Sequence, residues 1–296
     1  MYEEIIIHGA ITGGTLALLA IGFSLIYGVS EVVNMAHGAI YMLGTYFYFI
    51  LTAPPPYGTF QLDVVPAIII AVGLSAILGA IIYRFTIDPI IEDLVAVLVV
   101  TVGVAIVIQQ LLLIRFGAFF RGVPNYVEGY QTILGVKVTN SHLLAFAVSM
   151  ILFLCLWLFI TKTKIGTAMR AVSQDREVTM LMGVNTVRLT MLTMGISSAI
   201  AALAGILITA STTGVAHPTM WQTPLYMSFA IVILGGLGSI KGTFIGAFIV
   251  GYAENIFVYS VPGGSYLKGM VALGVMATVL IVRPKGLFGK RVELED

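Results

Sequence analysis

The stretch Asn34-Met35-Ala36-His37-Gly38 places an amide, an imidazole and a glycine between two apolar segments, at about residues 5–28 and 39–53. Polar groups that lipid surrounds lose their hydrogen bonds to water. Such residues therefore persist mainly where they line a cavity or a water-filled path. A second break, Gly235-Gly236-Leu237-Gly238-Ser239, also lies between apolar segments. A further interpretation of the first break is that Glu31, Asn34 and His37 only cap two helix ends in the headgroup region.

The composition predicts an all-α polytopic membrane protein with a single transmembrane domain over residues 1–296. The chain has 296 residues, 59% of them hydrophobic and 10% charged, and a mean hydropathy of +1.03. An average soluble domain carries about 25% charged residues. The net charge of +1 favours no nucleic-acid partner, and the single Cys155 allows no internal disulfide. Because Met1-Tyr2-Glu3-Glu4 is acidic, we expect no cleavable signal and a retained first helix.

Hydropathy predicts about nine transmembrane segments. Eight or ten remain possible if one segment is broken or re-entrant. The expected segments are 5–28, 39–53, 64–84, 94–115, 142–160, 189–210, 224–238, 243–259 and 267–282.

The basic residues predict the orientation in the cell inner membrane. Eleven of the fifteen fall on one side if the loop 161–188 and the C-terminal tail share that side. These are Arg84, Lys162, Lys164, Arg170, Arg176, Arg188, Lys241, Arg283, Lys285, Lys290 and Arg291. Cytoplasmic loops are enriched in Lys and Arg. We therefore expect an external N-terminus and a cytoplasmic C-terminus.

The loop 161–188 has a helical pattern over residues 168–183. Ala168, Ala171, Val172, Val178, Leu181 and Met182 recur at a spacing near 3.6 residues, and Gly183 follows as a helix stop. A short amphipathic helix of this kind either docks into a groove on a partner protein or lies on the bilayer surface. The residues alone leave both interpretations open.

Two further groups of residues stand out inside the apolar segments. Gly235, Gly236, Gly238, Gly242 and Gly246 predict close helix packing. Glu254 and Asn255 are polar residues within an apolar segment, so they are either functional or hydrogen-bonded between helices. Gln109 and Gln110 favour hydrogen bonding between helices.

Catalytic motifs are absent from the sequence. The nearest string to a phosphate-binding loop, Gly238-Ser239-Ile240-Lys241-Gly242-Thr243, has Lys before Gly instead of after it. No His-Glu-x-x-His string occurs, and four scattered histidines predict no metal site. We expect no catalytic residues, no metal and no cofactor in this chain. Any ATP hydrolysis that drives it belongs to another polypeptide.

Four segments resemble the permease subunits of branched-chain amino-acid ABC importers, most closely the shorter of the two paralogous permeases. The segments are Gly22-Phe23-Ser24-Leu25-Ile26-Tyr27-Gly28, Asn34 to Gly38, Arg170 to Asn185, and Gly235 to Gly246. Met35 departs from the usual Phe of the Asn-Phe-Ala-His-Gly string, and Val178-Thr179 stand where alanines are common.

The resemblance implies a complex of two permeases, two ATPases that bind ATP and Mg²⁺, and an external solute-binding protein. It assigns ATPase coupling to the loop that holds Arg170, Ala171, Asp175, Leu181 and Gly183. We place Asn34, His37 and Gly38 near the translocation path, with Glu254 and Asn255 as further candidates. Branched-chain amino acids, other amino acids, urea and short amides remain open as solutes. The second permease is either a paralogue or another copy of this chain.

The alternative function is a self-sufficient secondary transporter or channel for a small polar solute such as urea or an amide. Its broken helices would bind the solute at the midplane of the bilayer. It would need a site for a coupling ion, and Glu254 with Asn255 is the candidate that the sequence offers.

Overall fold

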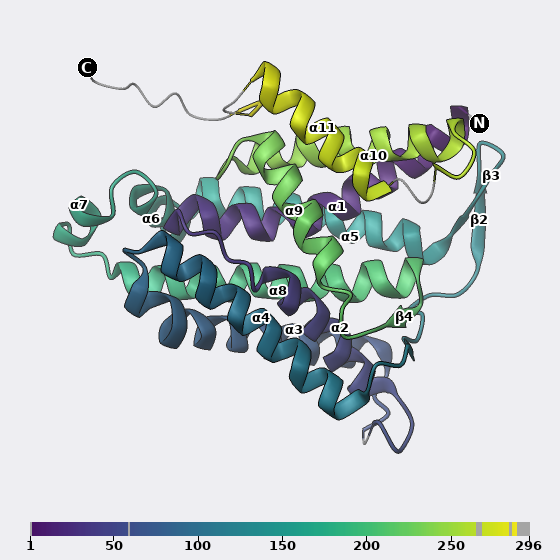
Figure 1. Ribbon diagram of the computed structural model, residues 1–296, viewed down its shortest axis with the longest axis horizontal. Helices are drawn as coiled ribbons and strands as arrows, with labels where there is room; N and C mark the ends of the chain where they lie inside the picture. The colour runs from purple at the N-terminus through teal and green to yellow at the C-terminus, as the bar shows by residue number, and fades with distance from the viewer. Residues whose placement is uncertain (1, 59, 265–267, 284–285, 289–296) are drawn as a thin grey trace.

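The computed structural model describes residues 2–58, 60–264, 268–283 and 286–288, and within them the fold is built from helices (Figure 1). The helices are α1 (Tyr2–Ser30), α2 (His37–Thr52), α3 (Val64–Ile82), α4 (Leu94–Phe116), α5 (Asn140–Lys162), α6 (Lys164–Val172), α7 (Arg176–Leu181), α8 (Thr186–Thr212), α9 (Gln222–Gly235), α10 (Ile240–Ser260) and α11 (Lys268–Val282). A π-helical turn, Tyr83–Ile87, and a 3₁₀ turn, Asp88–Ile90, extend α3.

Every apolar segment expected from hydropathy forms a helix, which confirms the all-α polytopic fold. Within the described part of the chain, six helices are long and apolar enough to cross a bilayer: α1, α3 with its extension, α4, α5, α8 and α10. The remaining apolar helices α2, α9 and α11 have 16, 14 and 15 residues, fewer than the roughly 20 that a full crossing needs. The number of complete crossings, nine, therefore stays a prediction.

The core lies around α1 and α8. Most of α1 from Gly9 to Ile26 is buried, and α8 is buried along much of its length. By contrast, α3, α4 and α5 bury one narrow face each and expose Ile, Leu and Val on the others. Apolar side chains on the outside are what a lipid environment allows, since lipid solvates them as well as a protein core does.

Small residues bring α1 against α10. A Cβ added at Gly13 would lie 2.9 Å from the Cα of Phe248, and one at Gly251 would lie 2.4 Å from the Gly13 nitrogen. The Gly9-x-x-x-Gly13 pattern therefore packs helix on helix, as small residues at this spacing do in membranes.

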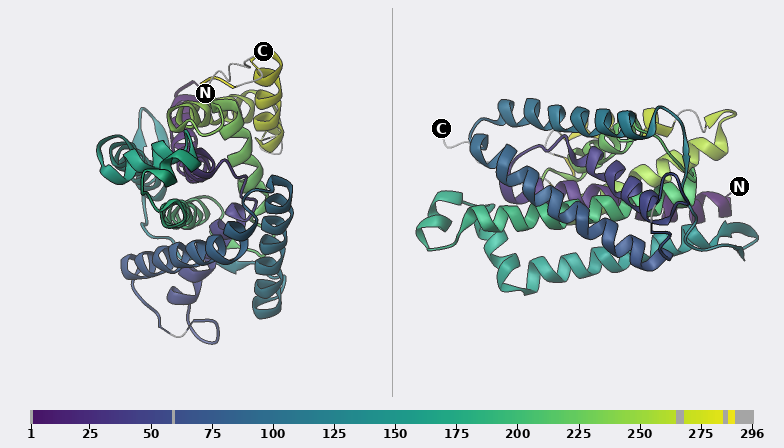
Figure 2. Two further views of the ribbon diagram at one scale, coloured as in Figure 1. Left: turned by 90° about the vertical axis from the view of Figure 1, so that its left-hand side faces the viewer. Right: turned by 90° about the horizontal axis from the view of Figure 1, so that it is seen from below.

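The two ends of the molecule differ in composition. One end, called here the α7 end, carries α6, α7 and the start of α8, and the other, called the hairpin end, carries the N-terminus and the strands β2 (Tyr130–Ile133) and β3 (Val136–Thr139) (Figures 1 and 2). Lys162 ends α5 and Lys164 begins α6, and Arg170, Arg176 and Arg188 follow. Lys285, Lys290 and Arg291 lie outside the described residues.

Two short antiparallel sheets complete the hairpin end. β2 pairs with β3, and Leu134 and Gly135 between them both have positive φ angles, 49° and 83°. Two such residues are typical of a tight hairpin turn. β1 (Arg121–Gly122) pairs with β4 (Val215–Ala216), which joins the loop after α4 to the chain that follows α8.

The loop 161–188 differs in one respect from the expectation. The helix expected over 168–183 is two helices, α6 and α7, separated at Ser173–Asp175. The Asp175 carboxylate accepts a hydrogen bond from the Val178 nitrogen at 2.9 Å and so caps α7. A side-chain cap of this kind starts a new helix. The apolar periodicity over 168–183 therefore covers two helices instead of one.

Candidate translocation and coupling sites

The chain reverses direction between α1 and α2 inside the molecule. α1 ends at Ser30, and Glu31 has a φ of 55°. The Asn34 side-chain oxygen accepts a hydrogen bond from the Ala36 nitrogen at 3.0 Å, and the Met35 nitrogen donates to Thr101 Oγ1 of α4 at 3.2 Å. These bonds satisfy backbone groups that have no helical partner in the break.

His37 marks the depth at which α2 begins. Its Nε2 lies 3.1 Å from the Leu19 carbonyl oxygen. Leu19 stands eleven residues before the last residue of α1, which corresponds to about 16 Å along a helix. α2 therefore begins well inside the molecule. The N-cap residue of α2, Ala36, makes no side-chain cap. This geometry is incompatible with the interpretation of Asn34 and His37 as simple caps in the headgroup region.

α9 begins at the same depth as α2. A Cβ added at Gly38 would lie 2.5 Å from the Trp221 carbonyl oxygen and 2.9 Å from Leu225 Cβ. Trp221 Nε1 donates a 2.6 Å hydrogen bond to Gln109 Oε1 of α4. The expected interhelical hydrogen bond of Gln109 is therefore present. The first turns of two short helices meet here, and the glycine at position 38 is what lets them touch.

The side chains of the Asn34–Gly38 motif are enclosed by protein. Asn34 and His37 are 0% and 1% exposed, and the His37 ring lies edge-on to Phe23. Among the described residues, His37 Nδ1 has no hydrogen-bond partner. In this conformation the motif joins α1, α2 and α9 rather than facing an open channel, and its place on the path stays a prediction.

Glu254 and Asn255 lie at the contact between α10 and α1. Asn255 Nδ2 donates to Thr12 Oγ1 at 3.0 Å and to the Gly251 carbonyl at 2.8 Å. Glu254 is 2% exposed, and its Oε1 has no partner among the described residues. Asn255 thus fits the interhelical interpretation, whereas Glu254 has no structural bond at that oxygen. The residues that the structure describes contain no group of three His, Cys, Asp or Glu side chains arranged to hold a metal.

The second glycine-rich break is a tight turn near the α7 end. α9 ends at Gly235 and α10 begins at Ile240. Gly236 and Gly238 have φ angles of 99° and 77°, which favour glycine. A Cβ added at Gly235 would lie 2.4 Å from the Gly242 carbonyl carbon. These contacts agree with the prediction of helix packing for this glycine cluster.

The α7 region carries most of the expected coupling residues on its surface. Arg170, Asp175, Leu181 and Gly183 are exposed and Ala171 is half-buried. Gly183 has a φ of 85° and directly follows the last turn of α7. The buried face of α6 is anchored on α1, because Met169 and Val172 pack against Val29 near the end of that helix. A force on α6 would therefore reach α1 just before the break at Glu31.

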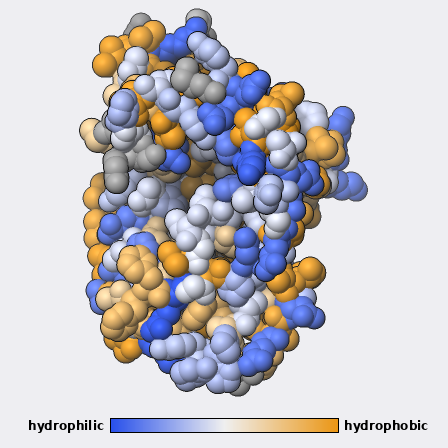
Figure 3. Space-filling view, turned by 90° about the vertical axis from the view of Figure 1, so that its right-hand side faces the viewer, coloured by the Kyte–Doolittle hydropathy of each residue, from blue (hydrophilic) through white to orange (hydrophobic). Residues whose placement is uncertain are grey.

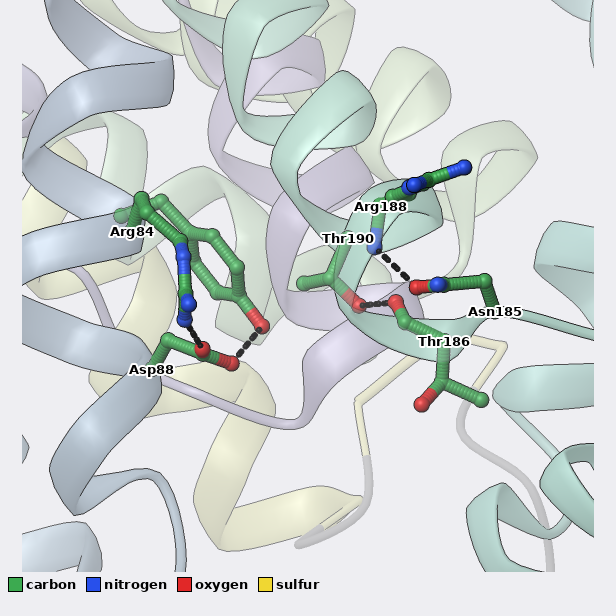
Figure 4. Close-up of polar contacts among 7 residues, drawn as sticks. Arg84, Asp88, Asn185, Thr186, Arg188 and Thr190 are labelled. Atoms are coloured by element: carbon green, nitrogen blue, oxygen red, sulfur yellow. Dashed lines mark hydrogen bonds and ion pairs between the residues drawn. The ribbon is translucent and has the colours of Figure 1, made fainter.

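Side-chain hydrogen bonds stabilise helix ends at the α7 end of the molecule (Figure 4). Asp88 accepts hydrogen bonds from Arg84 at 2.5 Å and from Tyr83 at 3.2 Å. The Asn185 side chain caps α8 by accepting from the Arg188 nitrogen at 2.9 Å. These bonds stabilise the helical turns after α3 and the first turn of α8, and the π-helical turn contacts α8.

Two residues that hold the breaks were not foreseen from the sequence: Thr101 and Trp221. Thr101 is the one threonine of α4 and stands within a run of apolar residues, which is a common and uninformative pattern. Trp221 stands three residues after His217-Pro218, a pair that is typical of a turn. Its position directly before a short apolar segment was the available signal for a helix that starts below the surface.

Together, the fold and these breaks define a class: a polytopic helical membrane protein with two short helices that begin inside the bilayer region. The branched-chain amino acid transport system permease component family matches residues 5–280. The chain therefore belongs to this family of transport permeases.

Individual relatives agree along nearly the whole chain. The high-affinity branched-chain amino acid transport system permease protein BraD of Pseudomonas aeruginosa is 31% identical over 98% of this chain and 96% of its own length. The corresponding LivH of Escherichia coli K12 is 30% identical over 96% and 94%. PsaBC from Streptococcus pneumoniae, solved in complex with Fab, shares the fold, with a TM-score of 0.52, 14% identity, and coverage of 95% of this chain and 92% of that chain.

Proposed function

We propose that this chain is the permease subunit of an ATP-binding-cassette importer in the cell inner membrane. The observation that carries the proposal is the apolar surface at the tip of the α7 end. Met180, Leu181 and Met182 are 58%, 84% and 80% exposed. Arg176 and Glu177 precede them in the first turn of α7, and α7 projects along the long axis of the molecule (Figure 1). An exposed apolar patch with a polar rim is typical of a protein interface.

The partner at this surface is an ATPase. The chain has no phosphate-binding loop in its sequence, so in the proposed importer ATP and Mg²⁺ are bound by a partner subunit. Closure of two ATPases would move α6 and α7, and the contact of α6 with Val29 would pass the movement to the end of α1. A swing between 1:99 and 99:1 populations needs about 5.5 kcal/mol of differential stabilisation.

The orientation follows from the charges. The basic residues of α6, α7 and the first turn of α8 lie at one end, which supports a cytoplasmic α7 end and an external N-terminus. The hairpin end then receives solute from an external binding protein.

Branched-chain amino acids are the proposed solutes, because the names of the curated relatives specify them. The described transmembrane helices carry few charged side chains, which suits a low-affinity conduit for a zwitterion. A second permease, either a paralogue or another copy of this chain, completes the membrane part.

The test is affinity purification of the tagged chain from its native membrane in mild detergent, followed by mass spectrometry. We expect an ATPase with a phosphate-binding loop and a second permease in near-stoichiometric amounts. Uptake of radiolabelled leucine should require that ATPase. If the chain is recovered alone after gentle cross-linking, and uptake follows an ion gradient instead, the proposal is wrong and the secondary-transporter alternative holds.

A further inference from the structure

The first turn of α9 lies at membrane depth and on the surface of the subunit. Trp221 is bonded to Gln109, which stands seven residues before the last residue of α4, about 10 Å along that helix. Trp221 also touches Gly38, next to His37, which contacts Leu19 in the middle part of α1. In Figure 1, α9 lies between α11 above it and α4 below it.

This first turn exposes three polar side chains. Gln222, Thr223 and Tyr226, called here the α9 strip, are all exposed, and Tyr226 is 59% exposed. Residues spaced by three and four positions share one helix face, so the three side chains form one surface. None of the described residues makes a hydrogen bond to these three side chains.

Other hydroxyl side chains in the spanning helices differ from the α9 strip. Thr101, Thr190 and Ser228 each donate to the carbonyl four residues earlier, at 2.7–2.9 Å, and so satisfy themselves within their own helix. Even the exposed Thr278 of α11 donates to the Gly274 carbonyl. The side chains of the α9 strip make no such hydrogen bond within their own helix. Their hydrogen-bond partners therefore have to come from outside the subunit.

Lipid is a poor environment for this surface. The backbone between Thr213 and Trp221 is largely non-helical and enters the bilayer region beside the strip. Non-helical backbone at membrane depth is tolerated only where protein buries it or where it lines a water-filled cavity. Seen from the hairpin end, the surface of the molecule is hollowed near its centre (Figure 3).

The side of the strip that faces α4 is apolar. On α4, Val102 and Ile106 share the face of Gln109 and are 38% and 45% exposed. Interfaces between proteins commonly enclose ordered water, so a second membrane subunit that covered this face would leave the strip hydrated.

We propose that Gln222, Thr223 and Tyr226 line the water-filled solute path, on the face of α9 that the second permease covers. This inference rests on the proposed function and specifies where the path runs. The strip offers an amide and two hydroxyl groups and no charge. Such groups hydrogen-bond both the carboxylate and the ammonium group of an amino acid without holding either tightly. The path then lies between two permeases and passes beside the Asn34–Gly38 motif, since Gly38 contacts Trp221 directly before the strip.

The test compares the reactivity of single cysteines in the assembled complex, in native membranes and in the Cys155→Ala background. Q222C, T223C and Y226C report on the strip. A147C of α5 is the matched control, because Ala147 is exposed and also stands seven residues from the hairpin end of its helix. Since the thiolate is the reactive form and does not form in apolar surroundings, we expect a water-soluble thiol reagent to modify the strip at least about tenfold faster than A147C.

Two results would overturn the inference. If Q222C, T223C and Y226C all react as slowly as A147C, the strip is covered by lipid or by dry protein. If they react quickly but added leucine and nucleotide change none of the modification rates, the strip is in contact with water but does not line the solute path. In both cases each variant is first shown to co-purify with the ATPase. Loss of ATPase from the unmodified complex would instead contradict the proposed function.

Discussion

Gly38 sets how closely α2 and α9 approach, because its missing Cβ is where the Trp221 carbonyl lies. We expect Gly38→Ala to destabilise the protein by about 1–3 kcal/mol, the usual cost of forcing extra atoms into a packed site. The measurement is the melting temperature in detergent, followed by size-exclusion chromatography. Gly103→Ala on α4 is the control, since a Cβ there meets nothing within 4 Å. Equal melting temperatures for both variants would contradict the close contact.

Glu254 and Asn255 are adjacent in sequence but have different surroundings. Asn255→Ala removes the hydrogen bond to Thr12 of α1, and we expect a loss of about 1–2 kcal/mol of stability. Glu254→Gln replaces a buried carboxyl whose Oε1 has no described partner, so we expect an unchanged or higher melting temperature. Leucine uptake by the Glu254→Gln complex then tests function apart from folding. Unchanged uptake would remove Glu254 from the translocation path.

At the scale of an element, α7 is short and depends on its surroundings. Six residues are too few for an independently stable helix in water. The Asp175 cap and the anchoring of α6 by Met169 and Val172 hold it at the tip of the molecule. Its apolar side chains then face outward, available to a partner.

The same geometry predicts the effect of a charge on the α7 tip. We expect Leu181→Asp to reduce the co-purified ATPase at least about tenfold, since burying an unpaired charge in an interface costs more than the 1.4 kcal/mol that a tenfold change requires. The fold is unaffected because Leu181 is 84% exposed. Phe119→Asp at the hairpin end, where the side chain is 72% exposed, is the control and retains the ATPase. Equal ATPase recovery in both variants would place the docking surface elsewhere.

At the scale of the whole molecule, the two ends differ in charge and define the orientation. We expect E128C, in the loop before β2, to react with an impermeant thiol reagent in intact cells or spheroplasts. Val178→Cys on α7 should react only after the membrane is opened, because both positions are exposed but lie at opposite ends of the molecule. Labelling of Val178→Cys from outside would invert the proposed orientation.

Much of this organisation is determined by the sequence alone. Hydropathy located all nine apolar helices, because each apolar run has to satisfy its backbone hydrogen bonds within itself in lipid. The Asn34–Gly38 and Gly235–Ser239 breaks, and the basic loop between α5 and α8, also follow from residue type. The family could be identified from the same segments.

Only the tertiary structure decided the depth of the breaks and the surroundings of their side chains. The bond of His37 to Leu19 and the contact of Gly38 with Trp221 join residues far apart in sequence. Local patterns carry no information about such pairs. The same holds for the α9 strip: Gln222, Thr223 and Tyr226 are ordinary residues in sequence. They become informative only because the tertiary structure leaves them exposed at membrane depth, and none of the described residues makes a hydrogen bond to their side chains.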